Sequence, residues 1–67
     1  MDEISLKILK ALSELKEPAG CGEIGKKADL TVQKVMGKLR SLSKEGLVES
    51  PVKGKYVITE KGRSALK

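Results

Sequence analysis

The chain has 67 residues, of which 39% are hydrophobic, yet it contains no Phe, no Trp and a single Tyr. A chain of this length forms one small domain with a marginal core, and here that core must consist of Ile, Leu, Val and Ala. One Cys and no His exclude an internal disulfide and argue against a structural zinc site, so we expect no metal and no cofactor.

The net charge of +5 is unevenly distributed along the chain. Residues 1–25 contain three Lys against five Asp or Glu, a charge of −2, whereas residues 26–67 contain eleven Lys or Arg against four Asp or Glu, a charge of +7. Such a basic section is typical of a surface that binds a polyanion, although a Lys-rich solvated surface has the same composition. The charge therefore favours a nucleic acid as the partner without deciding the question.

The N-terminal sequence and the lengths of the apolar runs indicate where in the cell the protein is located. Met1 is followed directly by Asp2 and Glu3, so the basic and apolar regions of a signal peptide are missing. No apolar run approaches the roughly 20 residues that a bilayer-spanning helix requires. We therefore expect a cytoplasmic, nucleoid-associated protein with no membrane partner.

Residues 2–16 are predicted to form an amphipathic helix. Apolar side chains recur there at helical spacing, with Lys and Glu between them: Ile4, Ile8, Leu9, Leu12 and Leu15. Asp2 and Glu3 suit the positive end of the helix dipole. Pro18 ends the helix, because the residue before a proline disfavours helical backbone angles.

A short helix over residues 22–28, a tight turn at residues 29–30 and a longer helix over residues 32–44 are predicted next. Thr31 is the expected N-cap of the longer helix, because a Thr hydroxyl accepts a hydrogen bond from a free amide of the first turn. The core side of that helix is formed by Val35, Leu39 and Leu42. Gly46 ends it at a position where a left-handed residue is favoured.

Beyond residue 46 the apolar pattern changes from helical to alternating, which predicts strands over residues 47–50 and 55–58. Gly54 supplies the turn between the two strands. Pro51 cannot donate to a ladder of hydrogen bonds, so it suits the exposed edge of a two-stranded wing.

Thr59 is the expected N-cap of a final short helix over residues 60–66. The complete order is helix, short helix, turn, helix, two-stranded hairpin and helical tail. We therefore expect a single domain over residues 1–67, mainly α with a small antiparallel β-hairpin (α+β). The expected architecture is that of a winged helix-turn-helix, with a three-helical core, a wing and a short C-terminal helix.

Three segments resemble winged helix-turn-helix regulators. Residues 23–31, EIGKKADLT, resemble their second helix and turn, and the apolar positions of residues 35–48 follow at the spacing of their recognition helix and wing entry. Residues 56–63, YVITEKGR, resemble the end of the second wing strand in the MarR and ArsR superfamilies. The resemblance covers residues 4–66 and implies a small protein of prokaryotic or archaeal type that binds double-stranded DNA and regulates transcription.

The chain departs from these families in three respects. It lacks the Cys and His clusters of the metal-sensing members, so metal sensing is not implied. It has little room for the long flanking helices through which MarR-type proteins dimerise. Gly25 and Gly37 occupy positions where helix-forming residues are commoner, each at a cost of up to about 1 kcal/mol relative to Ala.

The predicted recognition helix, residues 31–45, contains several basic residues and no acidic residue before Glu45. A major groove about 12 Å wide admits such a helix, with its N-terminal residues nearest the bases. The candidates for reading bases are Gln33, Lys34, Gly37, Lys38 and Ser41. The wing, residues 47–58, is expected on the DNA backbone or in the minor groove. The candidates for contacting phosphates are Lys26, Lys27, Thr31, Arg40, Lys44, Lys53 and Lys55.

Two further side chains have alternative interpretations. Tyr56 could stack on a base, but its alternation with Ile58 favours packing in the core. Cys21 lies near the start of the short helix, where it is either a redox switch or a small residue in a capping position, and we favour the second. Met36 is assigned no special role.

An enzyme is not expected, because the chain has no His, no nucleophile–base pair and no phosphate-binding glycine loop. Stacking on single-stranded RNA needs several aromatic side chains. The alternative that stays open is a winged helix module that binds another protein or a structured RNA. Residues 59–63 also resemble such modules in RNA-processing and tRNA-charging enzymes. Protein interfaces are poor in Lys, so the Lys-rich helix favours DNA.

The oligomeric state stays open as well. Duplex-binding modules commonly act as symmetric dimers. The surface of the first helix or residues 64–67 could supply a homodimer interface. Because little apolar surface is left over for that purpose, a monomer or a weak dimer is nearly as compatible with the sequence.

Overall fold

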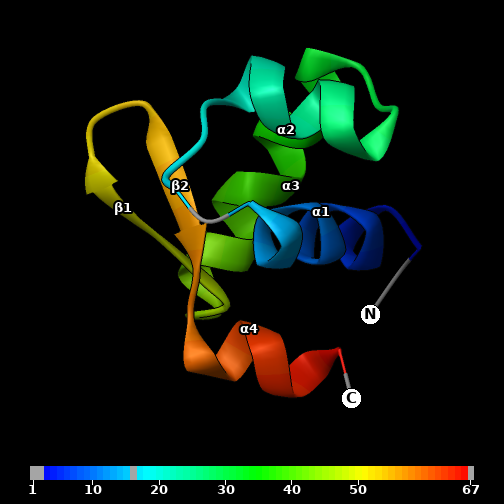
Figure 1. Cartoon of the computed structure of the whole chain (residues 1–67). Helices are drawn as coiled ribbons and strands as arrows, with labels where there is room; N and C mark the ends of the chain where they lie inside the picture. Colours follow the sequence, from blue (N-terminus) through cyan, green and yellow to red (C-terminus); the bar gives the residue numbers. More distant parts are fainter. Residues whose placement is uncertain (1–2, 16, 67) are drawn as a thin grey trace.

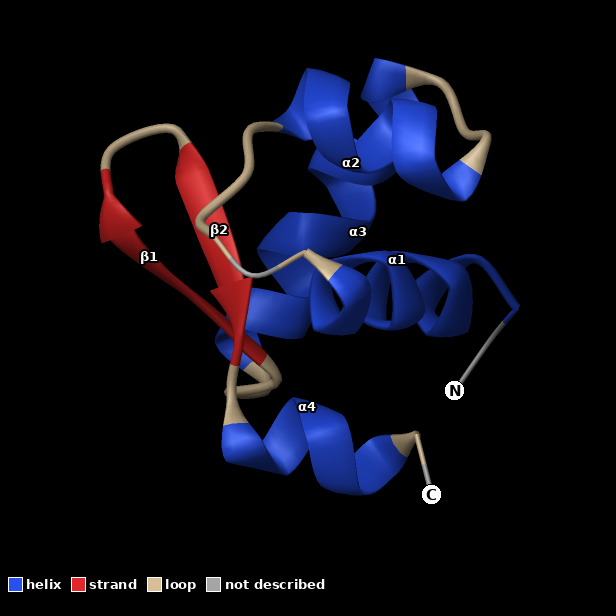
Figure 2. Ribbon diagram, viewed as in Figure 1, coloured by secondary structure: helices blue, strands red, loops and turns tan. Residues whose placement is uncertain are grey.

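The computed structural model describes residues 3–15 and 17–66, which contain four helices and a two-stranded antiparallel hairpin (Figures 1 and 2). In chain order the elements are α1 (Glu3–Glu14), α2 (Cys21–Ala28), α3 (Val32–Lys44), β1 (Val48–Val52), β2 (Lys55–Ile58) and α4 (Glu60–Ala65). Figure 1 shows the hairpin at one edge of the helices, with α4 at the end opposite the hairpin tip. The predicted fold class, a mainly α winged helix arrangement with a small hairpin, is confirmed.

Helices α1, α2 and α3 supply most of the core. Ile8, Leu9 and Leu12 line one side of α1 and are almost completely buried. They belong to one cluster with buried side chains of α2, α3, the hairpin and the residue before it, namely Ile24, Val35, Leu39, Leu42, Leu47, Val48 and Ile58. This aliphatic cluster supplies the main favourable term in folding, and it fixes which sides of α1 and α3 face the solvent.

The turn between α2 and α3 is tight because the α2 backbone contacts it directly. Asp29 adopts left-handed backbone angles (φ 59°), and the Leu30 amide donates a hydrogen bond to the Gly25 carbonyl at 2.7 Å. A Cβ atom on Gly25 would lie 2.7 Å from the Leu30 carbonyl oxygen, closer than such atoms approach in real structures. The turn therefore requires a residue without a Cβ atom at position 25, which explains why Gly25 occurs there despite its low helix propensity. The sequence pattern did not reveal this reason.

Strands β1 and β2 form the predicted wing. Val48 is paired with Ile58, and the register shifts between Glu49 and Val52, around Pro51. The strand β1 therefore continues past the proline. It spans Val48–Val52, where residues 47–50 had been expected.

A third segment pairs with β2 on the side away from β1. The Ala19 amide donates to the Tyr56 carbonyl at 3.0 Å, and the Tyr56 amide donates to the Ala19 carbonyl at 2.8 Å. This bridge, which no sequence pattern predicted, attaches the wing to the connection between α1 and α2. It also leaves β1 as the edge strand, the position that suits Pro51.

Helix α4 is attached to the turn that follows α3. The Thr59 hydroxyl accepts a hydrogen bond from the Gly62 amide at 3.1 Å and donates one to the Gly46 carbonyl at 2.7 Å. The Lys61 ammonium donates to the Glu45 carbonyl at 3.0 Å. Gly62 packs directly against the backbone that leads into β1, where a Cβ atom would clash. These contacts fix the base of the wing.

The predicted caps are confirmed. Thr31 caps α3, with its hydroxyl accepting from the Lys34 amide at 3.4 Å, and Thr59 caps α4. Gly46 has the expected left-handed conformation (φ 79°) after α3. Helix α4 ends one residue earlier than predicted, since Leu66 is its C-cap.

Two helix boundaries differ from the prediction. Helix α1 spans Glu3–Glu14 where residues 2–16 were expected, and Asp2 and Lys16 lie outside the described residues. Helix α2 begins at Cys21, one residue early, because the extended residue Gly20 (φ −81°, ψ 169°) is its N-cap. The interpretation of Cys21 as a capping residue is therefore wrong.

In the part of the chain that the structure describes, no helix is long and apolar enough to cross a membrane. Within residues 3–15 and 17–66 there is also no group of three or more His, Cys, Asp or Glu side chains that could hold a metal ion.

Candidate nucleic-acid interface

Helix α3 has a buried side and an exposed side along its whole length. The buried side consists of Val35, Leu39 and Leu42, which are almost completely covered by the core. At 100° per residue, the opposite side consists of Gln33, Gly37, Arg40 and Lys44, all of which are exposed. Figure 2 shows α3 passing behind α1, and the two helices are in contact. The exposed side of α3 therefore faces away from the core.

The charge on the exposed side of α3 is of one sign. Lys34, Arg40 and Lys44 are exposed, and no Asp or Glu occurs between Val32 and Lys44. A helix whose surface only keeps a protein soluble usually mixes Glu and Lys at a spacing of four residues. The positive charge of α3 is therefore not offset by carboxylates of the same helix, which suits contact with a polyanion.

The predicted base-reading residues do not all lie in equivalent positions. Four of them are exposed on α3, namely Gln33, Lys34, Gly37 and Ser41. Lys38 is half-buried and lies toward the flank of the helix. The Thr31 hydroxyl, a predicted phosphate contact, already accepts the capping hydrogen bond of α3, although its proton is still available for donation.

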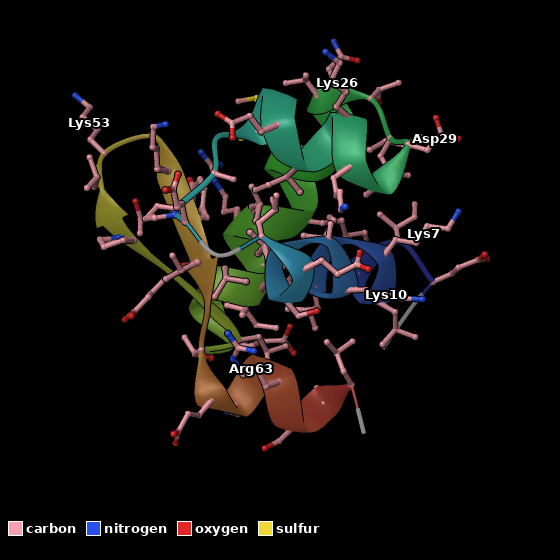
Figure 3. All side chains as sticks on the ribbon, in the orientation of Figure 1. Lys7, Lys10, Lys26, Asp29, Lys53 and Arg63 are labelled. Carbon is pink, nitrogen blue, oxygen red and sulfur yellow. The ribbon has the colours of Figure 1, made fainter. Side chains whose placement is uncertain are left out.

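The two wing lysines have different surroundings. Lys53 is exposed beside Gly54, and Figure 3 shows it at the wing tip, pointing away from the body of the protein. The Lys55 ammonium lies 3.9 Å from a carboxylate oxygen of Glu23 on α2. This ion pair, which joins the wing to α2, was not expected from the sequence. The positive charge of Lys55 is thus partly offset, while that of Lys53 points into solvent.

The two lysines of α2 line surface depressions that α2 shares with α1. Lys26 and Lys27, with Leu15 and Glu23, line a shallow depression between α2 and the end of α1. Lys27 also lines a groove with Lys7 and Lys10 of α1. Figure 3 shows these two α1 lysines on the side of the molecule away from Lys53. The structure therefore does not bring Lys27 together with the basic residues of α3 and the wing tip.

Two apolar residues of α3 are exposed, and sequence reasoning assigned them no function. Val32 is 46% exposed and Met36 is 56% exposed, whereas Val35 between them is fully buried. At 100° per residue, Met36 falls between the core side and the exposed side, so the apolar pattern alone does not decide its burial.

The flank of α3 that contains Met36 borders the wing. Met36, Arg40 and Ser43 line a pocket of about 300 Å³ with wing residues Ser50 and Tyr56 and with Cys21 of α2. Tyr56 is half-buried and packs against the core, in agreement with the predicted packing role. The Arg40 guanidinium is the charged group at this pocket.

Comparison with other proteins agrees with this geometry. The sequence pattern of the family described as winged helix-turn-helix matches residues 1–67, the whole chain. An uncharacterized protein of Methanocaldococcus jannaschii, MJ0558, is 49% identical over 45 residues. That match covers 67% of this chain and 17% of the relative, so the chain spans only a small part of the relative's length.

A solved structure has the same fold. A proposed transcriptional regulator protein from Pseudomonas aeruginosa PA01 superposes with a TM-score of 0.84 over 98% of this chain and 50% of that chain. The two sequences are 20% identical, so this likeness concerns the fold alone. The family match over residues 1–67 shows that the chain belongs to the winged helix-turn-helix family.

Proposed function

We propose that this protein binds double-stranded DNA as a transcription regulator, with α3 in the major groove and the wing on the backbone or in the minor groove. The observation that carries the proposal is the exposed side of α3, which has Lys34, Arg40 and Lys44 and no carboxylate along its length. The regulatory role is supported by the description of the Pseudomonas protein as a proposed transcriptional regulator. Catalysis is not part of the proposal.

The first turns of α3 are the part proposed to read bases. The side-chain amide of Gln33 can pair with adenine through two hydrogen bonds, and the ammonium of Lys34 can reach the O6 or N7 atom of guanine. The position of Gly37 is open, because among the described residues no atom other than the adjacent residues and the nearby helix backbone lies within 4 Å of where its Cβ would be. The helix backbone can therefore approach the base edges closely at this point.

The remaining basic residues are proposed to contact phosphates. Arg40 and Lys44 lie further along α3, where a helix in the groove leaves the bases, and Lys53 extends from the wing tip (Figure 3). Such contacts position the protein on the duplex and carry no sequence information. Each phosphate that a basic side chain neutralises makes the affinity fall more steeply with salt.

A fluorescence anisotropy titration with duplex DNA at several salt concentrations tests the proposal. The variant Arg40→Ala/Lys44→Ala is expected to bind more weakly and to lower the slope of log affinity against log salt by about 1.8, from two lost phosphate contacts. The matched control is Lys7→Ala/Lys10→Ala, which removes the same charge from α1 and is expected to bind like the wild type. No binding at low salt, or equal losses in the two variants, would contradict the proposal.

A further inference from the structure

Two exposed apolar residues of α3 lie together on one flank of the helix, next to a basic residue. Val32 is the first residue of the helix, and Met36 follows four positions later, so their side chains lie on the same flank one turn apart. Each of the two residues is about half exposed, at 46% and 56%. We call Val32 and Met36 the apolar strip.

The surroundings of the apolar strip restrict what can cover it. Arg40 is exposed and continues the strip by one further turn, whereas Lys34 lies on the opposite flank of α3. Because α3 has no carboxylate, a partner that covers the strip also meets uncompensated positive charge. Charge complementarity therefore favours a polyanion that offers apolar groups over an ordinary protein surface.

The major groove of DNA contains one such apolar group. The C5 methyl of thymine projects into the groove, and the other bases present hydrogen-bond donors and acceptors there. The N-terminal residues of a recognition helix lie nearest the base edges, and the strip occupies the first two turns of α3. The thioether of Met36 is flexible, so it can adjust to a methyl group whose position varies along the site.

We propose that the apolar strip, Val32 and Met36, contacts thymine methyl groups in the major groove and makes this protein prefer duplexes that contain thymine at those positions. The inference rests on the proposed duplex binding, because it assigns a specificity to the same surface. Each methyl group that is removed from water in this way is expected to raise the affinity about fourfold.

The test compares two A·T-rich duplexes of identical sequence, one with thymine and one with deoxyuridine throughout. Uracil keeps the hydrogen-bonding groups of thymine and lacks only the methyl. The wild type is expected to bind the thymine duplex at least about fourfold more tightly, the gain from one contacted methyl. The variant Val32→Thr/Met36→Gln, which keeps side-chain size and removes apolar character, is expected to bind both duplexes equally. Met36→Gln alone is expected to lose part of the preference and serves if the double variant folds poorly.

Val52→Thr is the matched control. Val52 is 57% exposed on β1, outside α3, so its replacement is expected to leave the preference for thymine unchanged. A wild type that binds the two duplexes equally would overturn the inference and leave the strip to a protein partner. A preference that persists in the double variant would also overturn it, since the methyl would then act through the shape of the DNA. Absence of binding to either duplex would instead refute the duplex binding itself.

Discussion

Gly25 and Gly37 have the same intrinsic helix propensity, but their surroundings differ. At Gly25 the hypothetical Cβ atom meets the Leu30 carbonyl at 2.7 Å and a methyl of Val35 at 3.5 Å. At Gly37, in the described part of the chain, the corresponding space is empty to 4 Å. The first glycine is therefore a packing requirement of the helix-turn-helix, and the second lies on the proposed DNA surface.

Gly25→Ala is expected to lower the free energy of unfolding by about 1–3 kcal/mol, because the backbone of the turn must move to admit the methyl. Gly37→Ala is expected to raise it by up to about 1 kcal/mol, the difference in helix propensity between Gly and Ala. Urea denaturation followed by circular dichroism measures both values. Changes of the same sign in the two variants would contradict the contacts described for Gly25.

The two capping threonines make different sets of hydrogen bonds at the element scale. The Thr31 hydroxyl accepts one bond, at 3.4 Å, from the Lys34 amide. The Thr59 hydroxyl caps α4 at 3.1 Å and also donates to the Gly46 carbonyl at 2.7 Å. Thr59 therefore joins α4 to the turn after α3, whereas Thr31 acts within a single helix end.

Thr59→Ala is expected to lower the free energy of unfolding by about 2 kcal/mol, since both a cap and a second hydrogen bond are lost. Thr31→Ala is expected to cost about 1 kcal/mol or less, because its capping bond is long. Thermal and urea denaturation of the two variants give the comparison. The control Thr59→Ser keeps the hydroxyl and is expected to stay near the wild type; a full loss in that variant would show that the hydrogen bonds are not the cause.

At the scale of the whole molecule, the basic surface combines α3 with the wing, and the wing is held by contacts distant in sequence. The bridge between Ala19 and Tyr56 and the ion pair between Glu23 and Lys55 both attach it to the segment around the start of α2. These contacts set the direction of the wing relative to α3. They also make the two wing lysines unequal, since among the described residues Lys55 has a carboxylate partner, Glu23 at 3.9 Å, and Lys53 has none.

Lys53→Ala is expected to weaken duplex binding and to lower the salt slope by about 0.9, the loss of one phosphate contact. Lys55→Ala is expected to have a smaller effect, because Glu23 already offsets part of its charge. Glu23→Gln is expected to strengthen binding by releasing Lys55 for the DNA. The same anisotropy titration measures all three variants, and equal losses for the two lysines would refute the distinction.

The sequence by itself determined the features that depend on residues close together in the chain. The helical period of α1 and α3, the caps Thr31 and Thr59 and the left-handed Gly46 each depend on a few neighbouring positions, and all were predicted correctly. For the same reason the basic side of α3 could be identified before the fold was known. Helix ends were predicted less accurately, because Gly20 and Cys21 are both compatible with the N-cap position of α2.

Only the tertiary structure decided which distant residues meet. Three contacts each join segments more than a dozen residues apart: the packing of Gly62 against the wing entry, the Ala19–Tyr56 bridge and the Glu23–Lys55 ion pair. The exposure of Met36 belongs here too, because its burial depends on whether another element covers that flank of α3. A local pattern carries no information about such contacts, since they arise from how the helices and the wing pack around one core.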